Sequence, residues 1–431
     1  MSITLSPWNR YPKISSEKVI SWTDRTKPLP KTPMIAYANG RSYSDVCLTS
    51  DGTPVLTRPL NKFIEFDRQT GKLKAEAGVT LQEILTLVVP QGWFLQVTPG
   101  TQFVTLGGAL ANDVHGKNHH SVGSFGNFVL NFELLRSDGQ RLVCSPDTNQ
   151  QWFEATIGGL GLTGLIVWVE IQLQPINNPA MVVQSESFSN LTRFWDVNSK
   201  HSSTSPYTVA WLDCAATGRK LGRGVFFAGR HAGALNTYPT HPETTKSVPI
   251  ESPVSLINRF SLKAFNALYA RQPTKPEGFI QHYIPYFYPL DAIKNWNRLY
   301  GKKGFFQYQC VLPMESAPEG LNLLLKDISK SGQGSFLAVL KTFGDIPSKG
   351  LLSFPRPGAT LALDFANRGN STLRLLSKLD EIVKDHGGAL YPAKDGRMSS
   401  EMFKHSFPLW EHFSESIDPY FCSDFWSRVS R

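Results

Sequence analysis

The segment Thr105–Phe128, TLGGALANDVHGKNHHSVGSFGNF, holds five glycines and three histidines among 24 residues, which are residue types that could bind a ligand. A metal site is one interpretation, because His115 and His119 stand four residues apart and would share one face of a helix. Gly116 interrupts such a helix, however, and Asp113 is the one carboxylate at ligand spacing. The residues therefore favour a binding site for a polar ligand that accepts or donates a hydrogen bond to His115. No metal is predicted.

A second glycine-rich turn, Tyr37–Asp45 (YANGRSYSD), also follows a short apolar stretch. Glycine permits a positive φ and close approach of the backbone to a ligand, and successive N–H groups in such turns bind anions. The hydroxyls of Ser42, Ser44 and Thr101 add donors. Two such loops suit a pyrophosphate, although tight turns at sheet corners remain an alternative. The sequence contains neither GxxxxGK[ST] nor a strand–GxGxxG–helix unit, so a P-loop or Rossmann site is not expected.

The elements that must position these turns are short strands and few helices over the first ~175 residues. KFIEFDRQTGKLKAEAGV and VLNFELLRSDGQRLVCSP alternate on both sides of a turn and predict hairpins. Thr80 is a good N-cap for a helix whose apolar side chains are Leu81, Ile84, Leu85 and Val88.

The second half predicts an α+β layer, in which an antiparallel sheet carries helices on one face. Residues 231–276 are rich in Pro, Thr, Ser and Lys and predict a loop with some mobility. The last ~30 residues are aromatic-rich and predict helices that dock on a core. Strands are expected over 180–215, 224–230, 304–313, 335–344 and 359–367, and helices over about 315–331 and 370–386.

Composition sets the limits of the interpretation. A chain of 431 residues exceeds the usual size of one core, so two domains are expected. A net charge of +9 favours anionic partners, but the charges are scattered and no nucleic-acid motif is present, so nucleic acid is not a predicted partner. The five cysteines show no pairing pattern and indicate free thiols. Because the N-terminus lacks a signal-peptide pattern and no apolar run would span a bilayer, we expect a cytoplasmic protein, at most peripheral at the inner membrane.

Several of these segments together resemble a known family. GRSYSD, AGVTLQEIL, PGTQFVTLGGALANDVHGKNHHSVGSFGN and ATIGGLGLTGLI are similar to the FAD domain of the vanillyl-alcohol-oxidase (PCMH-type) flavoenzymes. Within that superfamily the HGKNHHS wording most resembles the decaprenylphosphoryl-ribose 2′-oxidase family. WNRLYGKKGFFQYQCVLP, SFLAVLKTFG, LSFPRPG and LYPAKDGRMSSEMF extend the similarity over roughly residues 30–430.

The resemblance implies a two-domain fold with FAD as cofactor. It assigns residues 1–180 plus 406–431 to a PCMH-type FAD-binding domain and residues 181–405 to an α+β substrate domain. Many relatives attach FAD covalently through a histidine in the first loop, where this chain has Arg41, so FAD is expected to be non-covalent. The implied FAD-binding residues are Asn39, Gly40, Arg41, Ser42, Tyr43, Ser44, Gly100, Thr105, Leu106, Gly107, Gly108, Asn112, Asp113, Val114, His115, Gly116, Asn118, His119, Ser121, Gly123, Ile166 and Tyr391.

The same resemblance implies two catalytic residues, Lys394 and His115. Lys394 matches the family's active-site lysine, and a lysine can act as a base where burial and neighbouring cations lower its pKa. Taken alone, the sequence favours a surface lysine paired with Asp395, and the resemblance reverses that interpretation. Polar residues of the substrate pocket are matched by Gln307, Gln309 and Lys341; the first two stand two apart and share one face of a strand.

The implied activity is oxidation of the 2′-hydroxyl of a polyprenylphosphoryl-β-D-ribose to the 2′-keto sugar by hydride transfer to the flavin. A separate short-chain NAD(P)H reductase would complete an epimerisation to the arabinose form, in cell-wall arabinan synthesis. A sugar-1,4-lactone or alditol oxidase of the same fold is the alternative, and a non-catalytic flavin- or ligand-binding protein is an alternative of another class. Mycobacterial relatives have a cysteine where this chain has Ala362, so thiol-directed covalent inhibitors are expected to fail here.

Overall fold

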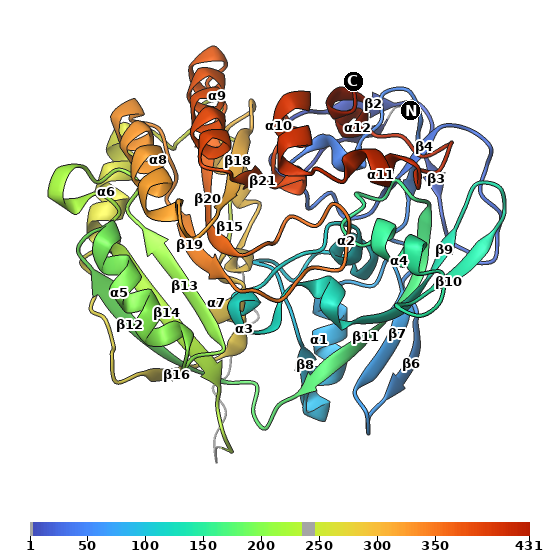
Figure 1. Cartoon of the computed structure of the whole chain (residues 1–431), viewed down its shortest axis with the longest axis horizontal. Helices are drawn as coiled ribbons and strands as arrows, with labels where there is room; N and C mark the ends of the chain where they lie inside the picture. The colour runs from blue at the N-terminus through green and yellow to red at the C-terminus, as the bar shows by residue number, and fades with distance from the viewer. Residues whose placement is uncertain (1–2, 235–245) are drawn as a thin grey trace.

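The computed structural model describes residues 3–234 and 246–431. Two large sheets follow one another along the chain and lie in different parts of the molecule (Figure 1). Five residues separate the last strand of the first sheet from the first strand of the second. The α+β class is confirmed, with antiparallel pairing throughout both large sheets.

The first large sheet has six strands in the order β10-β9-β11-β7-β6, with β8 paired to β11. Both predicted hairpins are confirmed, as β6–β7 and β9–β10. Helix α1 (Leu81–Val88) begins at a capping box between Thr80 and Glu83, and its four predicted apolar side chains are buried. The strands are β6 Phe63–Asp67, β7 Lys72–Glu76, β8 Trp93–Leu95, β9 Val129–Leu135, β10 Arg141–Cys144 and β11 Leu165–Pro175.

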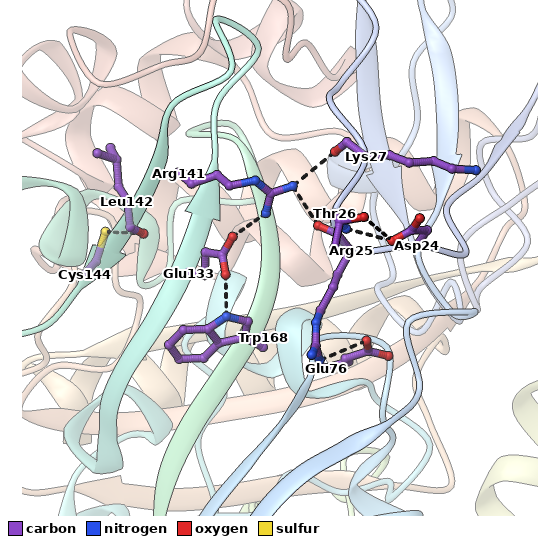
Figure 2. A network of polar contacts seen from close by, with 10 residues as sticks. All are labelled: Asp24, Arg25, Thr26, Lys27, Glu76, Glu133, Arg141, Leu142, Cys144 and Trp168. Carbon is purple, nitrogen blue, oxygen red and sulfur yellow. Dashed lines mark hydrogen bonds and ion pairs between the residues drawn. The ribbon is translucent and has the colours of Figure 1, made fainter.

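Side chains fasten the chain near residue 25 to this sheet (Figure 2). Glu133 on β9 accepts hydrogen bonds from Arg141 on β10 and from the indole of Trp168 on β11. Arg141 also donates to the carbonyls of Arg25 and Lys27, at 2.7 and 3.2 Å. The segment near residue 25 is therefore bonded to Arg141 of β10, and Glu133 connects Arg141 to β9 and to Trp168 of β11.

The two ends of the chain come together at a small parallel sheet, β3 (Ile20–Ser21), β5 (Thr53–Leu56) and β4 (Met34–Tyr37). The predicted C-terminal helices are confirmed and lie beside it in Figure 1. Cys422 N–H donates to Met34 O, and Arg428 forms an ion pair with Asp45. The helices are α10 Ser400–Ser406, α11 Trp410–Ser414 and α12 Asp424–Val429.

The second large sheet has eight strands in the order β16-β12-β14-β13-β19-β20-β18-β21. The three strands predicted near 304–367 and the helices predicted near 315–331 and 370–386 are confirmed as β18, β19, β20, α8 and α9. The helices α5, α8 and α9 pack on one face of the sheet (Figure 1), which leaves the other face for a ligand. The bounds are β12 Met181–Phe188, α5 Leu191–Ser202, β13 Tyr207–Leu212, β14 Gly224–His231, β16 Phe279–Gln281, β18 Phe305–Leu312, α8 Ala317–Ser331, β19 Ala338–Phe343, β20 Gly358–Ala366, α9 Asn370–Asp385 and β21 Ala389–Leu390.

Two predictions about the second half were wrong in part. Residues 180–215 are not all strand, because Leu191–Ser202 form α5: Asn190 caps it, and Leu191, Phe194 and Val197 are buried at helical spacing. Residues 231–276 are not one loop, because Arg259–Tyr269 form helix α6 behind the N-cap Asn258. The predicted mobility of this segment is untested, and its residues 235–245 lie outside the described part.

The division into residues 1–180 plus 406–431 and residues 181–405 remains a proposal. The six-stranded and eight-stranded sheets fall on either side of residue 180, and the C-terminal helices pack near Met34, as that division requires. Among the described residues, none of the helices combines the length and apolar character needed to cross a bilayer.

Candidate active site

A cavity of about 860 Å³ lies between the two glycine-rich turns and the open face of the eight-stranded sheet. This volume is near the upper end of the range for ligand sites, ~300–1,000 Å³. One wall is built by residues 36–47, 98–117 and 160–166, and the other by side chains of β13, β14, β18, β19 and β20. The two loops singled out in the sequence therefore contribute to one site.

The turn at Gly40 has the form of an anion-binding loop. Gly40 adopts a positive φ of 55°, and the main-chain N–H groups of residues 39–42 donate to no acceptor among the described residues. Consecutive free N–H groups around a left-handed residue form a concave site for an anion. This arrangement fits a pyrophosphate.

Two further glycines on this wall leave space in the cavity. Gly100 and Gly161 line it, and a Cβ atom at either position would meet no atom within 4 Å, so it would enter the cavity itself. Gly107 is different, because its Cβ would lie 2.8 Å from that of Ala77. Gly100 and Gly161 thus leave room for a ligand. Gly107 instead permits close packing of α2 (Leu106–Ala111) on Ala77, which directly follows β7.

Three buried polar atoms on lining residues have no hydrogen-bond partner among the described residues: Asn112 Oδ1, Arg41 Nε and Gln307 Oε1. Buried polar atoms are normally paired, so these atoms point to a ligand. The Arg41 guanidinium lies between the rings of Trp8 and Phe103, at 4.1 and 4.9 Å from their centroids. Donors, acceptors and a cation packed on aromatic rings line the same cavity, which fits a large polar cofactor such as FAD.

The segment 105–108 does not supply the free donors that the sequence suggested. Leu106 N–H donates to Val79 O, Gly107 N–H to Ala77 O, and Gly108 N–H to the hydroxyl of Thr105. The first turn of α2 is therefore bonded within the protein, unlike the N–H groups of the Gly40 turn.

Most of the predicted FAD-binding residues line the cavity, and seven do not. Of these seven, Asp113 is buried and accepts hydrogen bonds from Ser124, Ser353 and Gly126 N–H. His119 packs on Phe343, and burial lowers its pKa to about 3, so it is a neutral brace. The predicted residues that line the cavity are Asn39, Gly40, Arg41, Ser42, Tyr43, Gly100, Thr105, Gly107, Gly108, Asn112, Val114, His115, Gly116, Ile166 and Tyr391. The predicted residues that do not line it are Ser44, Leu106, Asp113, Asn118, His119, Ser121 and Gly123.

The predicted substrate residues meet at the sheet face. Gln307 and Gln309 both line the cavity from β18, as their spacing predicted, and they pair in register with Asp364 and Ala362 of β20. Lys341 projects from β19 opposite Thr360. Three separate strands thus place their polar side chains on one surface.

His115 joins the glycine-rich segment to this surface. Its Nδ1 lies 2.9 Å from Lys341 Nζ, and its Nε2 lies 2.9 Å from the side-chain amide of Gln309. Burial, reinforced by Lys341, lowers the pKa of His115 well below its ordinary value, so the imidazole is neutral. A neutral ring carries one hydrogen and has one acceptor nitrogen. His115 therefore serves as a neutral hydrogen-bonding bridge.

Lys394 faces the cavity beside the ring of Tyr43, with Nζ 4.0 Å from the ring centroid. It is not paired with Asp395, which forms an ion pair with Arg397 instead. The Lys394 amine makes no hydrogen bond to a described residue, and burial lowers its pKa to about 8, opposed by Asp364. The geometry provides a lysine that can lose its proton near neutral pH.

Comparisons with known proteins place these features in a family. A family model described as "FAD binding domain" matches residues 25–145. The chain is 34% identical over 414 residues to decaprenylphosphoryl-beta-D-ribose oxidase of Mycolicibacterium smegmatis, covering 92% of this chain and 89% of the relative. It is 32% identical over 364 residues to an uncharacterized protein in the mprA 5′ region of Streptomyces coelicolor, covering 79% and 96%. D-arabinono-1,4-lactone oxidase of Yarrowia lipolytica is 25% identical over 197 residues, covering 44% and 37%.

The chain belongs to the decaprenylphosphoryl-beta-D-ribose oxidase family. FAD is its cofactor, and it is an FAD-dependent oxidoreductase that oxidises a CH–OH group. The alternative of a non-catalytic binding protein is therefore set aside. Non-covalent attachment of FAD remains a prediction.

Four charged residues that line the cavity were not predicted from the sequence: Lys117, Asp291, Lys294 and Asp364. Asp364 lies at hydrogen-bond distance from Gln307, at 2.9 Å, and burial raises its pKa to about 6. Lys117 donates to Tyr286 O, and burial lowers its pKa to about 7. Asp364 stands two positions after Ala362 on the same strand, and Lys117 stands two positions after His115 in the same loop. Their spacing was the available signal.

The position on β20 where mycobacterial relatives have a cysteine is Ala362 in this chain, but another cysteine, Cys47, lines the cavity. Cys47 is part of the wall near Ser42, whose hydroxyl lies 3.7 Å from the sulfur. Burial raises the pKa of this thiol to about 11, so little of it is the reactive thiolate at neutral pH. The expectation that thiol-directed inhibitors fail stays a prediction, now with a named thiol to test.

Proposed function

We propose that this protein oxidises the 2′-hydroxyl of a polyprenylphosphoryl-β-D-ribose to the 2′-keto sugar. The observation that carries the proposal is the set of three partly buried lysines that line one cavity, Lys394, Lys341 and Lys117. Lys394 is suited to remove a proton, and the other two are suited to receive an anion. The similarity to a ribose oxidase over most of the chain supports the same substrate class.

Lys394 would act as the general base. When bound, FAD supplies the acceptor for the hydride that leaves the alcohol carbon. The neutral amine of Lys394 takes the hydroxyl proton, and the resulting ammonium is stabilised by the nearby carboxylate of Asp364. Gln307 and Gln309 present amide groups that can orient the sugar hydroxyls.

Lys341 and Lys117 would receive the phosphodiester. The pKa of Lys341 is lowered to about 7 by burial first, and then by the positive charges of Lys117 and Lys394. Holding the Lys341 and Lys117 ammonium groups together in one cavity is unfavourable unless an anion joins them. A substrate with a negative charge next to its sugar satisfies that requirement, whereas a neutral lactone or alditol does not.

A second enzyme would use the product. A 2′-keto sugar becomes the epimeric alcohol when a hydride is returned to the other face of the carbonyl. We propose a short-chain NAD(P)H-dependent reductase as the partner for this step, as the family resemblance implied. The experiment is reconstitution: the oxidase and a candidate reductase together should form the arabinose epimer, and the oxidase alone should stop at the ketone.

A membrane contact is also part of the proposal. Phe260 and Leu268 on the outer face of α6 are 84% and 68% exposed, and Lys263 is exposed on the same face. Apolar side chains beside cations are typical of helices that lie on anionic lipid. At the inner face of α6, Tyr269 lines the cavity, so a lipid surface at α6 would be close to the substrate site.

The proposed reaction is tested by anaerobic reduction of the bound flavin with a panel of alcohols. Prenylphosphoryl-β-D-ribose should bleach the flavin absorbance, and free pentoses, alditols and sugar lactones should not. Bleaching by the free sugars, with peroxide release in air, would instead favour the lactone or alditol oxidase interpretation.

A further inference from the structure

The wall that the eight-stranded sheet gives to the cavity changes in character from strand to strand. On β18 and β20 the lining side chains include Gln307, Gln309 and Asp364. Lys341 follows on β19, the next strand in the sheet. Beyond it, the lining side chains of β13 and β14 are apolar. They are Val209, Trp211 and Phe227.

Strand register shows that these side chains share one face. Gln309 pairs with Ala362, Ala362 with Val339, and Val339 with Trp211, which forms one row across four strands. Direct partners across a sheet project to the same side. Val209 stands two residues before Trp211 on β13, so it projects to the same face, and it pairs with Phe227 of β14. The polar and apolar parts are therefore successive portions of one continuous surface.

Accessibility agrees with a cavity on this side. Along β13 and β14, Val209 and Phe227 are only partly buried, whereas their neighbours Ala210 and Phe226 are 0% and 1% exposed. Val339 on β19 is likewise partly buried between Ala338 and Leu340, which are both 0% exposed. These three apolar side chains border the cavity, and Phe227 also packs against the core behind it.

The cationic residues lie at the boundary between the two portions. Lys341 separates the polar strands from the apolar ones, and Lys117 lies with its Nζ 4.4 Å from the ring centroid of Tyr286, another lining residue. Along the sheet the order is hydrogen-bonding groups, then cations, then hydrocarbon. A ligand that matches this order has a sugar, an anionic link and an apolar chain.

Resting on the proposed function, we infer that the apolar portion of the cavity, formed by Val209, Trp211, Phe227 and Val339, binds the first isoprenoid units of the substrate. The chain then runs across the strands from β19 toward β14. Neighbouring strands are ~4.8 Å apart, so the step from Lys341 to Phe227 spans two strand spacings, or about 10 Å. That distance accommodates the start of a prenyl chain and not the whole of a long one.

The experiment measures binding of farnesyl phosphate and methyl phosphate to the FAD-loaded protein by calorimetry. Farnesyl phosphate should bind wild-type protein at least about tenfold more tightly, which corresponds to ~1.4 kcal/mol. Val209→Trp should remove most of this difference by filling the apolar portion. The matched control, Val143→Trp, changes an exposed valine on β10 and should leave it intact. Phe227→Ser, which removes apolar surface without adding bulk, should also weaken farnesyl phosphate binding, and serves if Val209→Trp does not fold.

The outcomes separate this inference from the proposed function. Equal affinity for the two phosphates, or a Val209→Trp protein that folds and still discriminates between them, overturns the tail site even if prenylphosphoryl ribose reduces the flavin. Tight, Val209-dependent binding of farnesyl phosphate without any oxidation of the ribose supports the tail site and refutes the proposed reaction.

Discussion

Replacing Lys394 by methionine removes the one amine that we assign to proton transfer while keeping the length of the side chain. The site is otherwise undisturbed, because the Lys394 amine makes no hydrogen bond to a described residue and contacts the ring of Tyr43. FAD binding should therefore persist. The rate of flavin reduction by the substrate should fall by roughly 10²–10⁴-fold, the usual contribution of a general base.

The structure also sets the pH dependence of wild-type protein. With a pKa of about 8, in place of the ordinary 10.5, Lys394 is neutral in roughly a quarter of the molecules at about pH 7.5, compared with ~0.1% for an ordinary lysine. The rate should rise with pH and level off above the Lys394 pKa. Because Asp364 raises that pKa, Asp364→Asn should move the midpoint to lower pH.

The assay is stopped-flow bleaching of the flavin under anaerobic conditions across a pH series. Lys378→Met, at a lysine that is ion-paired to Asp327 on the surface, is the control and should behave as wild type. Added small primary amines should partly restore Lys394→Ala. A Lys394→Met protein that retains FAD and reduces it at a near-normal rate, with an unchanged pH profile, would refute the assignment of the base.

Four further predictions follow from the cavity wall and the outer helix. Gly100→Leu should fold but lose most of its FAD, measured as the ratio of flavin to protein absorbance, whereas Gly233→Leu, also open but away from the cavity, should keep it; full FAD content in Gly100→Leu would contradict the cradle. Acid precipitation should leave the flavin in the supernatant, and a yellow pellet would show a covalent link. Lys341→Met should raise the KM for the phosphorylated substrate roughly 10- to 100-fold, the effect of one charge-assisted hydrogen bond, and change kcat less; an unchanged KM would exclude Lys341 from phosphate binding. Phe260→Glu should reduce co-sedimentation with anionic vesicles at least about tenfold, since one exposed aromatic side chain contributes ~2 kcal/mol when buried, and equal sedimentation would exclude α6 as the lipid contact.

The sequence was most informative where local signals agree. The Thr80 N-cap, the two hairpins and the helices near 315–331 and 370–386 depend on residues close together in the chain, and these elements were confirmed. α5 was missed because residues 180–215 were expected to be strand, and α6 was missed because its Asn cap and partial apolar stripe lie in a polar segment that was expected to be a loop.

The site could be predicted only through family resemblance. His115, Gln309 and Lys341 lie in three distant segments, and nothing in their spacing indicates that they share hydrogen bonds. The N–H groups of residues 106–108 looked available in sequence, but tertiary contacts with Val79 and Ala77 occupy two of them. Lys117 and Asp364 gain their importance from burial, which a single sequence does not reveal.

The most direct test of the central claim is the kinetic isotope effect on flavin reduction by prenylphosphoryl-β-D-ribose carrying deuterium at a single carbon. The account predicts slower bleaching when C2′ is deuterated, no change when C3′ is deuterated, and a product that has lost the C2′ label. An isotope effect at another carbon, or a product that retains deuterium at C2′, would contradict it.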